Sequence, residues 1–99
     1  MITEREKILN FLYHNKKKLS QDFGIDKIGL FGSYLNNLQN KDSDVDILIE
    51  VRKDFKKYKY YFELKEFLEN NMGREVDIIY KDAINPLIKM EIQKDILYV

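Results

Sequence analysis

The chain contains 99 residues, 44% of them apolar and 34% charged, so we expect a single folded domain spanning residues 1–99. Seventeen basic residues, mostly Lys, balance seventeen acidic ones. This balance argues against direct nucleic-acid binding and against attraction to an anionic membrane. The absence of Cys excludes disulfides and thiolate catalysis, and the longest apolar run is only residues 96–99. We therefore expect a cytoplasmic protein without a membrane span.

An amphipathic helix is predicted over about residues 4–22. Thr3 and Glu6 match a capping box, in which the two side chains satisfy N–H groups at the start of a helix. Gly24 predicts the end of this helix, because glycine readily adopts the left-handed conformation that ends many helices. The apolar positions that recur at helical spacing are Ile8, Leu9, Leu12 and Leu19.

Two strands are predicted in the next part of the chain. Residues 25–31 are apolar and end at Gly32, as expected of a short buried strand. Residues 33–38 follow directly and predict a brief helix, after which a polar loop begins. In residues 45–51 a β-branched apolar residue occupies every second position, which is the period of a strand with one buried face.

The remaining segments predict a helix over about residues 55–71, a strand over 75–80 and a last helix. This last helix starts near Pro86, which suits a first helical turn, and carries Ile88 and Ile92. Strands that alternate with helices predict an α/β (α+β) fold. We expect a small sheet, three-stranded or a larger mixed one, with helices mainly on one face.

Basic and aromatic residues are mixed in residues 55–62, as they are in proteins that bind single-stranded nucleic acid. On the predicted helix, however, Tyr61 would face the core and the Lys side chains would face water. We therefore predict a solvated helix face here. A surface that docks a partner protein is the alternative, because exposed tyrosines are common in interfaces.

The first candidate functional motif is Gly32-Ser33, where a strand is predicted to turn into a helix. Backbone N–H groups at such a junction, together with the helix dipole and the Ser33 hydroxyl, form a site for an anion, commonly a phosphate. By itself the pair is far more typical of a simple strand-to-helix turn with a serine cap. Gly32 and Ser33 become candidate nucleotide-binding residues because of the acidic residues that follow.

Asp44 and Asp46 form the second candidate motif, and ten residues separate Ser33 from Asp44. On a strand the two side chains leave the same face, about 6–7 Å apart at their Cα atoms, and can share divalent cations. Asp77 interrupts another apolar strand, and all three carboxylates would converge if the two strands are neighbours. Such a cluster needs a cation, and oxygen ligands favour Mg²⁺ or Mn²⁺. The structural alternatives are a solvated strand start and an edge-strand charge that deters aggregation.

Together these motifs resemble the minimal nucleotidyltransferases of the DNA polymerase β superfamily. The similarity runs through residues 30–34 (LFGSY), 42–49 (DSDVDILI) and 75–79 (EVDII), and continues in residues 85–98. The resemblance implies a nucleotidyltransferase-like fold and an antitoxin encoded beside a HEPN-domain ribonuclease toxin. It further implies transfer of AMP from ATP to a tyrosine hydroxyl of that toxin, with Mg²⁺ as the cofactor, in a two-metal site that could also accept Mn²⁺.

Carried over to this sequence, the resemblance implies that Gly32 and Ser33 hold the triphosphate. Asp44, Asp46 and Asp77 would be the catalytic residues and the metal ligands, with Asp77 near the attacking hydroxyl. One alternative is a binding module that neutralises its toxin by stoichiometric contact. Another is transfer of a nucleotide to a small molecule or to RNA.

The sequence departs from the family pattern after the Gly-Ser pair. Many members read Tyr-Ala-Arg-Gly there, whereas this chain has Tyr34-Leu35-Asn36-Asn37. Asn37 tolerates the left-handed conformation that Gly supplies, so we expect the turn to be kept. Asn36 removes a cation near the phosphates, which predicts weaker nucleotide binding or slower transfer.

Overall fold

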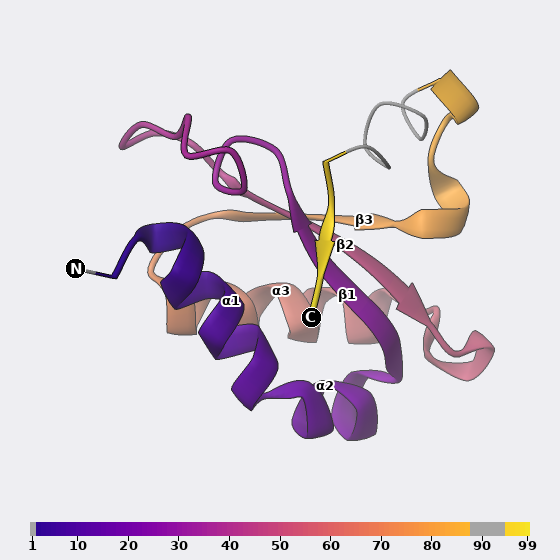
Figure 1. The fold of residues 1–99 in the computed structure, drawn as a ribbon. Coiled ribbons are helices and arrows are strands. Elements are labelled where there is room, and N and C mark those ends of the chain that lie inside the picture. The colour runs from indigo at the N-terminus through magenta and orange to yellow at the C-terminus, as the bar shows by residue number, and fades with distance from the viewer. Residues whose placement is uncertain (1, 88–94) are drawn as a thin grey trace.

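Three helices and four strands form the described part of the chain, which is residues 2–87 and 95–99 of a computed structural model (Figure 1). In chain order they are α1 (Glu4–His14), α2 (Lys16–Phe23), β1 (Ile25–Phe31), β2 (Val45–Val51), α3 (Tyr58–Met72), β3 (Val76–Tyr80) and β4 (Leu97–Tyr98). Short 3-10 turns follow β2 and β3, at Lys53–Phe55 (η1) and Lys81–Ala83 (η2). Within the described residues, no helix is both long and apolar enough to cross a membrane.

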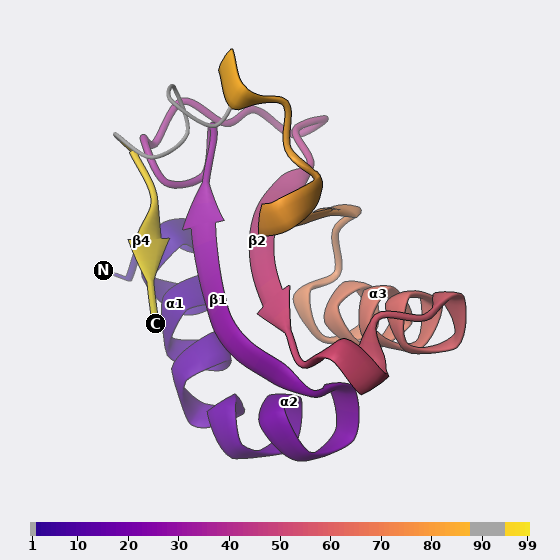
Figure 2. The same cartoon turned by 90° about the vertical axis from the view of Figure 1, so that its right-hand side faces the viewer.

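The four strands form one mixed sheet in the order β3-β2-β1-β4. β1 runs antiparallel to both of its neighbours, whereas β2 and β3 are parallel and are connected through α3. The helices lie together on one side of the sheet, as Figures 1 and 2 show from two directions. The predicted fold class is therefore confirmed, and the sheet is the larger, mixed one.

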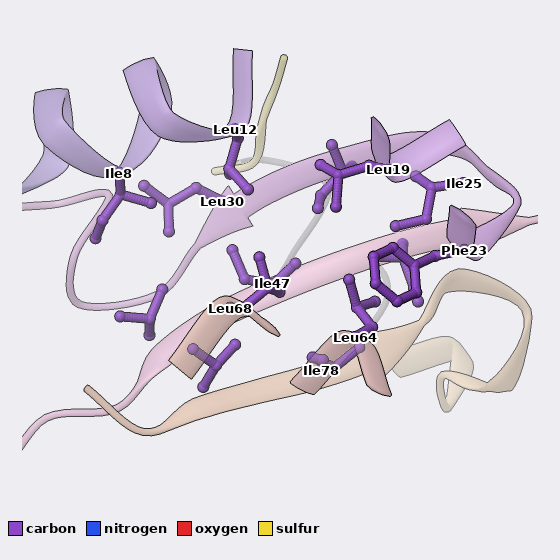
Figure 3. Close-up of a cluster of buried hydrophobic side chains, with 14 of the residues drawn as sticks. Ile8, Leu12, Leu19, Phe23, Ile25, Leu30, Ile47, Leu64, Leu68 and Ile78 are labelled. Carbon is purple, nitrogen blue, oxygen red and sulfur yellow. The ribbon is translucent and has the colours of Figure 1, made fainter. Parts of the chain in front are cut away.

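The core lies between the helices and one face of the sheet (Figure 3). Alternate side chains of β2, Val45 and Ile47, are fully buried there, and Val76 and Ile78 of β3 pack in register beside them. Leu12 and Leu68 cover them from the helices. Because side chains alternate along a strand, Asp46 points to the face that the helices do not cover.

The predicted helix over residues 4–22 is two helices that meet at Asn15. Thr3 caps α1 as predicted, by accepting a hydrogen bond from the backbone N–H of Glu6. Asn15 leaves helical geometry (φ −106°, ψ 11°), and its side-chain amide donates to the carbonyl of Phe11 at 2.8 Å. Asn competes with the backbone for hydrogen bonds in this way, which explains its position at a helix break. Gly24 ends α2 in the left-handed conformation, as expected.

Two other elements differ from the sequence predictions, and a third lies mostly outside the described residues. Residues 33–38 form hydrogen-bonded turns rather than a brief helix. α3 begins at Tyr58, since η1 takes up residues 53–55, and its Tyr61 and Met72 pack against the core as predicted. Residues 86–87 are helical, and the rest of the predicted last helix, with Ile88 and Ile92, lies outside the described residues.

Candidate active site

Gly32 turns the chain directly after β1 and brings this turn against β2. Its φ is +77°, which L-amino acids with a side chain rarely adopt. A Cβ atom at this position would overlap the Asp46 carboxylate, so a glycine is also required by the close approach of the two segments. The strand pairing explains this approach, because Phe31, the last residue of β1, is paired with Asp46. The structure thus brings together two motifs that are fourteen positions apart.

The turn after Gly32 is closed by hydrogen bonds within residues 32–38. The backbone N–H and the side-chain amide of Asn36 both donate to the Gly32 carbonyl, at 3.2 and 3.1 Å, and the N–H of Leu38 donates to the Ser33 carbonyl. Asn37 has a φ of +56°, which confirms that it takes the left-handed conformation. These bonds leave out the N–H groups of Ser33 and Tyr34. The turn therefore offers backbone donors beside the Ser33 hydroxyl, without the dipole of a helix.

Asp46 and Asp77 lie side by side on the parallel strands β2 and β3, where they are register partners. Asp46 is half-buried and Asp77 is exposed. Asp44 is exposed as well and lies one residue before β2, because that strand begins at Val45. The hydrogen bond from the Val45 N–H to the Glu75 carbonyl joins the starts of the two strands. The neighbouring strands thus place the three acidic residues at one end of the sheet.

The three carboxylates carry negative charges without an ion-pair partner among the described residues. Burial, together with the negative charges of Asp77 and Asp44, raises the pKa of Asp46 from 3.8 to about 6. A cation bound here would relieve both the repulsion and the cost of burial.

The chemistry of this donor set fits a hard divalent cation, because it consists of carboxylate oxygens only. As the side chains lie, however, no three acidic or His side chains of the described residues form a group that could hold a metal ion. Asp44 and Asp77 are exposed, so their carboxylates can turn toward Asp46 at small cost. The backbone therefore provides the arrangement, and binding of an ion would require rotation of side chains.

Tyr34 connects the Gly-Ser turn to the segment before Asp44, and the sequence analysis did not single it out. Its side chain is fully buried, and its hydroxyl donates to the Ser43 carbonyl at 3.5 Å. Arg5 of α1 also holds this turn, by donating to the Leu35 carbonyl at 3.0 Å. These contacts join residues nine and thirty positions apart in the sequence. No local spacing pattern could have indicated them.

Comparison with known proteins decides the family. Residues 13–99 match the family described as nucleotidyltransferase domain. The chain belongs to this family. The nucleotidyltransferase is 40% identical over 93 residues to "Putative protein adenylyltransferase MJ0128" of Methanocaldococcus jannaschii, covering 93% of this chain and 94% of that protein. It is 35% identical over 94 residues to the protein adenylyltransferase MntA of Thermococcus cleftensis, covering 95% of this chain and 94% of that protein.

Solved structures share the fold of this nucleotidyltransferase. A structure described as "putative minimal nucleotidyltransferase" matches it with a TM-score of 0.78 at 21% identity, covering 97% of this chain and 95% of that one. A toxin–antitoxin complex with AMP-PNP matches with a TM-score of 0.69 at 23% identity, covering 86% of this chain and 69% of that one. A Shewanella oneidensis complex of a tri-AMPylated HEPN toxin with its MNT antitoxin has a TM-score of 0.59 at 20% identity, covering 96% and 67%.

Proposed function

We propose that this nucleotidyltransferase is an antitoxin that transfers AMP from ATP to a tyrosine hydroxyl of a HEPN-domain toxin, in the cytoplasm. The observation that carries this proposal is the pairing of Asp46 with Asp77, with the Gly32 turn packed directly against Asp46. This arrangement places a turn that can hold phosphates beside carboxylates that can hold cations. The names of the M. jannaschii and T. cleftensis relatives support protein adenylylation as the reaction.

In this reaction the tyrosine oxygen attacks the α-phosphorus of ATP, an oxygen–phosphorus bond forms, and pyrophosphate leaves. Ser33 and the N–H groups of the turn after Gly32 bind the triphosphate and orient it for this displacement. The tyrosine proton passes to the carboxylate of Asp77, which is exposed and therefore accessible to a hydroxyl carried by another protein. The toxin thus supplies its own binding surface, and the antitoxin supplies the nucleotide and the carboxylates.

Mg²⁺ is the proposed cofactor, held by Asp44, Asp46 and Asp77. When bound, it would neutralise these carboxylates and stabilise the negative charge that develops on the phosphates. The raised pKa of Asp46 is consistent with this role, since the position favours a neutralised carboxylate. The same three residues would accept Mn²⁺, because it prefers the same oxygen ligands.

The proposal is tested by mixing the protein with the HEPN-domain toxin that it is proposed to neutralise, ATP and Mg²⁺. Mass spectrometry of the toxin should show added AMP units when the antitoxin is present in less than equimolar amount. Chelation of the metal should stop the transfer. Asp77→Asn should abolish it, and Glu50→Gln, an acidic position further along β2, is the matched control that should retain it.

Two other results would point to different functions. A toxin that is neutralised only at equal molar amounts, with its mass unchanged, would favour stoichiometric binding as the mechanism. Transfer of the nucleotide to RNA or to a small molecule, with the toxin unmodified, would show that the proposed acceptor is wrong.

A further inference from the structure

A groove of about 350 Å³ opens beside Asp44. Its lining does not include residues of the turn after Gly32. It is lined by residues 41–44, which lead into β2, and by residues 73–75, which lead from α3 into β3. Asp44 belongs both to this groove and to the group of three carboxylates. Anything bound in the groove would therefore be a direct neighbour of the proposed reaction centre.

Two cations, Lys41 and Arg74, line this groove. The Arg74 guanidinium lies over the ring of the buried Tyr34, 5.6 Å from its centroid, and its Nε is 3.9 Å from the Glu4 carboxylate. Glu4 is the only acidic partner of Arg74 within the described residues, and this distance is at the limit of an ion pair. A guanidinium held over an aromatic ring can still direct N–H donors to an anion. Arg74 is therefore positioned by Tyr34 and still able to bind an anion.

The groove also offers what the Gly32 turn lacks. Many members of the family that this sequence resembles carry Arg at the position of Asn36. The side-chain amide of Asn36 instead donates a hydrogen bond to the Gly32 carbonyl. The turn therefore contributes backbone donors and a hydroxyl but no cation. A nucleotide triphosphate carries about four negative charges, and cationic side chains normally share in neutralising them.

We propose that the phosphate chain held by the turn after Gly32 extends into this groove, where Arg74 and Lys41 contact it as cations. This inference rests on the proposed function, and it assigns to Arg74 the charge that Asn36 does not supply. Asp42, Asp44 and Glu75 also line the groove, so acidic residues outnumber basic ones when no metal is bound. Binding of the phosphates should therefore require the divalent cation that neutralises Asp44.

Arg74→Met provides the main test, because it removes the charge and keeps an unbranched side chain that can pack on Tyr34. Calorimetry with Mg-ATP and with magnesium tripolyphosphate should show affinity about tenfold weaker for both, roughly 1.4 kcal/mol. Lys41→Met, on an exposed loop, should show a smaller loss of the same kind and keeps the test valid if Arg74→Met is unstable. Arg74→Lys should retain part of the affinity.

Arg52→Met is the matched control. Like Arg74, Arg52 lies over an aromatic ring, 5.0 Å from the centroid of Phe55, and pairs with an acidic residue, Asp26, at 3.6 Å. It differs in position, because it follows the other end of β2, away from Asp44. Its substitution should leave both affinities unchanged.

Three results would overturn the proposal or its basis. Unchanged affinity in both Arg74→Met and Lys41→Met, with wild-type protein that binds Mg-ATP, would show that the groove does not hold the phosphates. A loss for Mg-ATP but not for tripolyphosphate would assign Arg74 to the nucleoside and refute the inference. Wild-type protein that binds neither probe would instead refute the proposed function itself.

Discussion

On the two faces of β2 and β3, the register partners have opposite effects on the stability of the sheet. On the face toward the helices, Ile47 is paired with Ile78, and both are buried apolar side chains that stabilise the sheet. One position earlier, on the opposite face, Asp46 is paired with Asp77, and two like charges oppose each other. The same pairing that stabilises one face thus destabilises the other. A sheet keeps such a pair when function requires it, which is the trade-off expected at an active site.

Ile47→Ala should cause the largest loss of stability among the changes predicted for the two faces, because Ile47 is fully buried between the sheet and the helices. We expect a loss of about 3 kcal/mol in the free energy of unfolding, within the range for deleting a buried aliphatic side chain. Urea denaturation measures this loss. Ile47→Val should lose less than about 1.5 kcal/mol, and equal losses for both variants would contradict tight packing here.

Mg-ATP should stabilise the wild-type protein by binding at the face of β2 and β3 that carries Asp46 and Asp77. At about one hundred times its Kd, a ligand adds roughly 2.7 kcal/mol to the apparent stability. The gain should be seen as a higher melting temperature, should disappear when the metal is chelated, and should be absent from Asp46→Asn. A gain that persists in this variant would place the nucleotide elsewhere on the molecule.

Gly32→Ala tests the contact between the turn and Asp46. Alanine at a φ of +77° costs about 1–2 kcal/mol in strain, and its Cβ would also overlap the Asp46 carboxylate. Gly73→Ala is a matched control, because Gly73 has a φ of +68° but no atom within 4 Å of an added Cβ. Denaturation should show Gly32→Ala to be the more destabilising by about 1 kcal/mol, as expected of overpacking. Equal losses would mean that the turn moves away at no cost.

Asp46→Asn should stabilise the metal-free protein at neutral pH. The folded state raises the pKa of Asp46 to about 6 from 3.8, so ionisation of this group opposes folding. In chelator at pH 7.5 the variant should be more stable by about 1 kcal/mol, a value reduced for solvent screening of a half-exposed carboxyl. The difference should shrink as the pH falls from about 6 to 4, because the wild-type carboxyl becomes protonated. Denaturation at several pH values measures it.

Asp26→Asn is the control for this pH series, since Asp26 is exposed and forms an ion pair with Arg52 at 3.6 Å. It should show no gain at pH 7.5. A metal-free Asp46→Asn that is less stable than wild type at pH 7.5 would show that Asp46 is a structural residue of β2.

Much of the fold could be predicted because its signals are local. The period of two in residues 45–51 assigned Val45 and Ile47 to one face and Asp46 to the other, and the structure confirms both assignments. Thr3 as the cap of α1 and Asn37 in the left-handed conformation were predicted from the preferences of single residues. The break at Asn15 was missed, because apolar spacing continues across it and the local competition for hydrogen bonds leaves no trace in that pattern.

The amino-acid sequence alone was enough to nominate the candidate site residues: a Gly-Ser pair after a strand, two carboxylates at spacing two, and a third within an apolar strand. The packing of distant segments was needed to show that β3 lies parallel beside β2, so that Asp77 is the register partner of Asp46, and that Arg74 lies over Tyr34 beside a groove. The two kinds of feature differ in how far apart along the chain the residues that cause them lie. A side chain's face follows from the backbone period within a few residues, whereas strand neighbours, register and a raised pKa depend on packing between segments far apart in the chain.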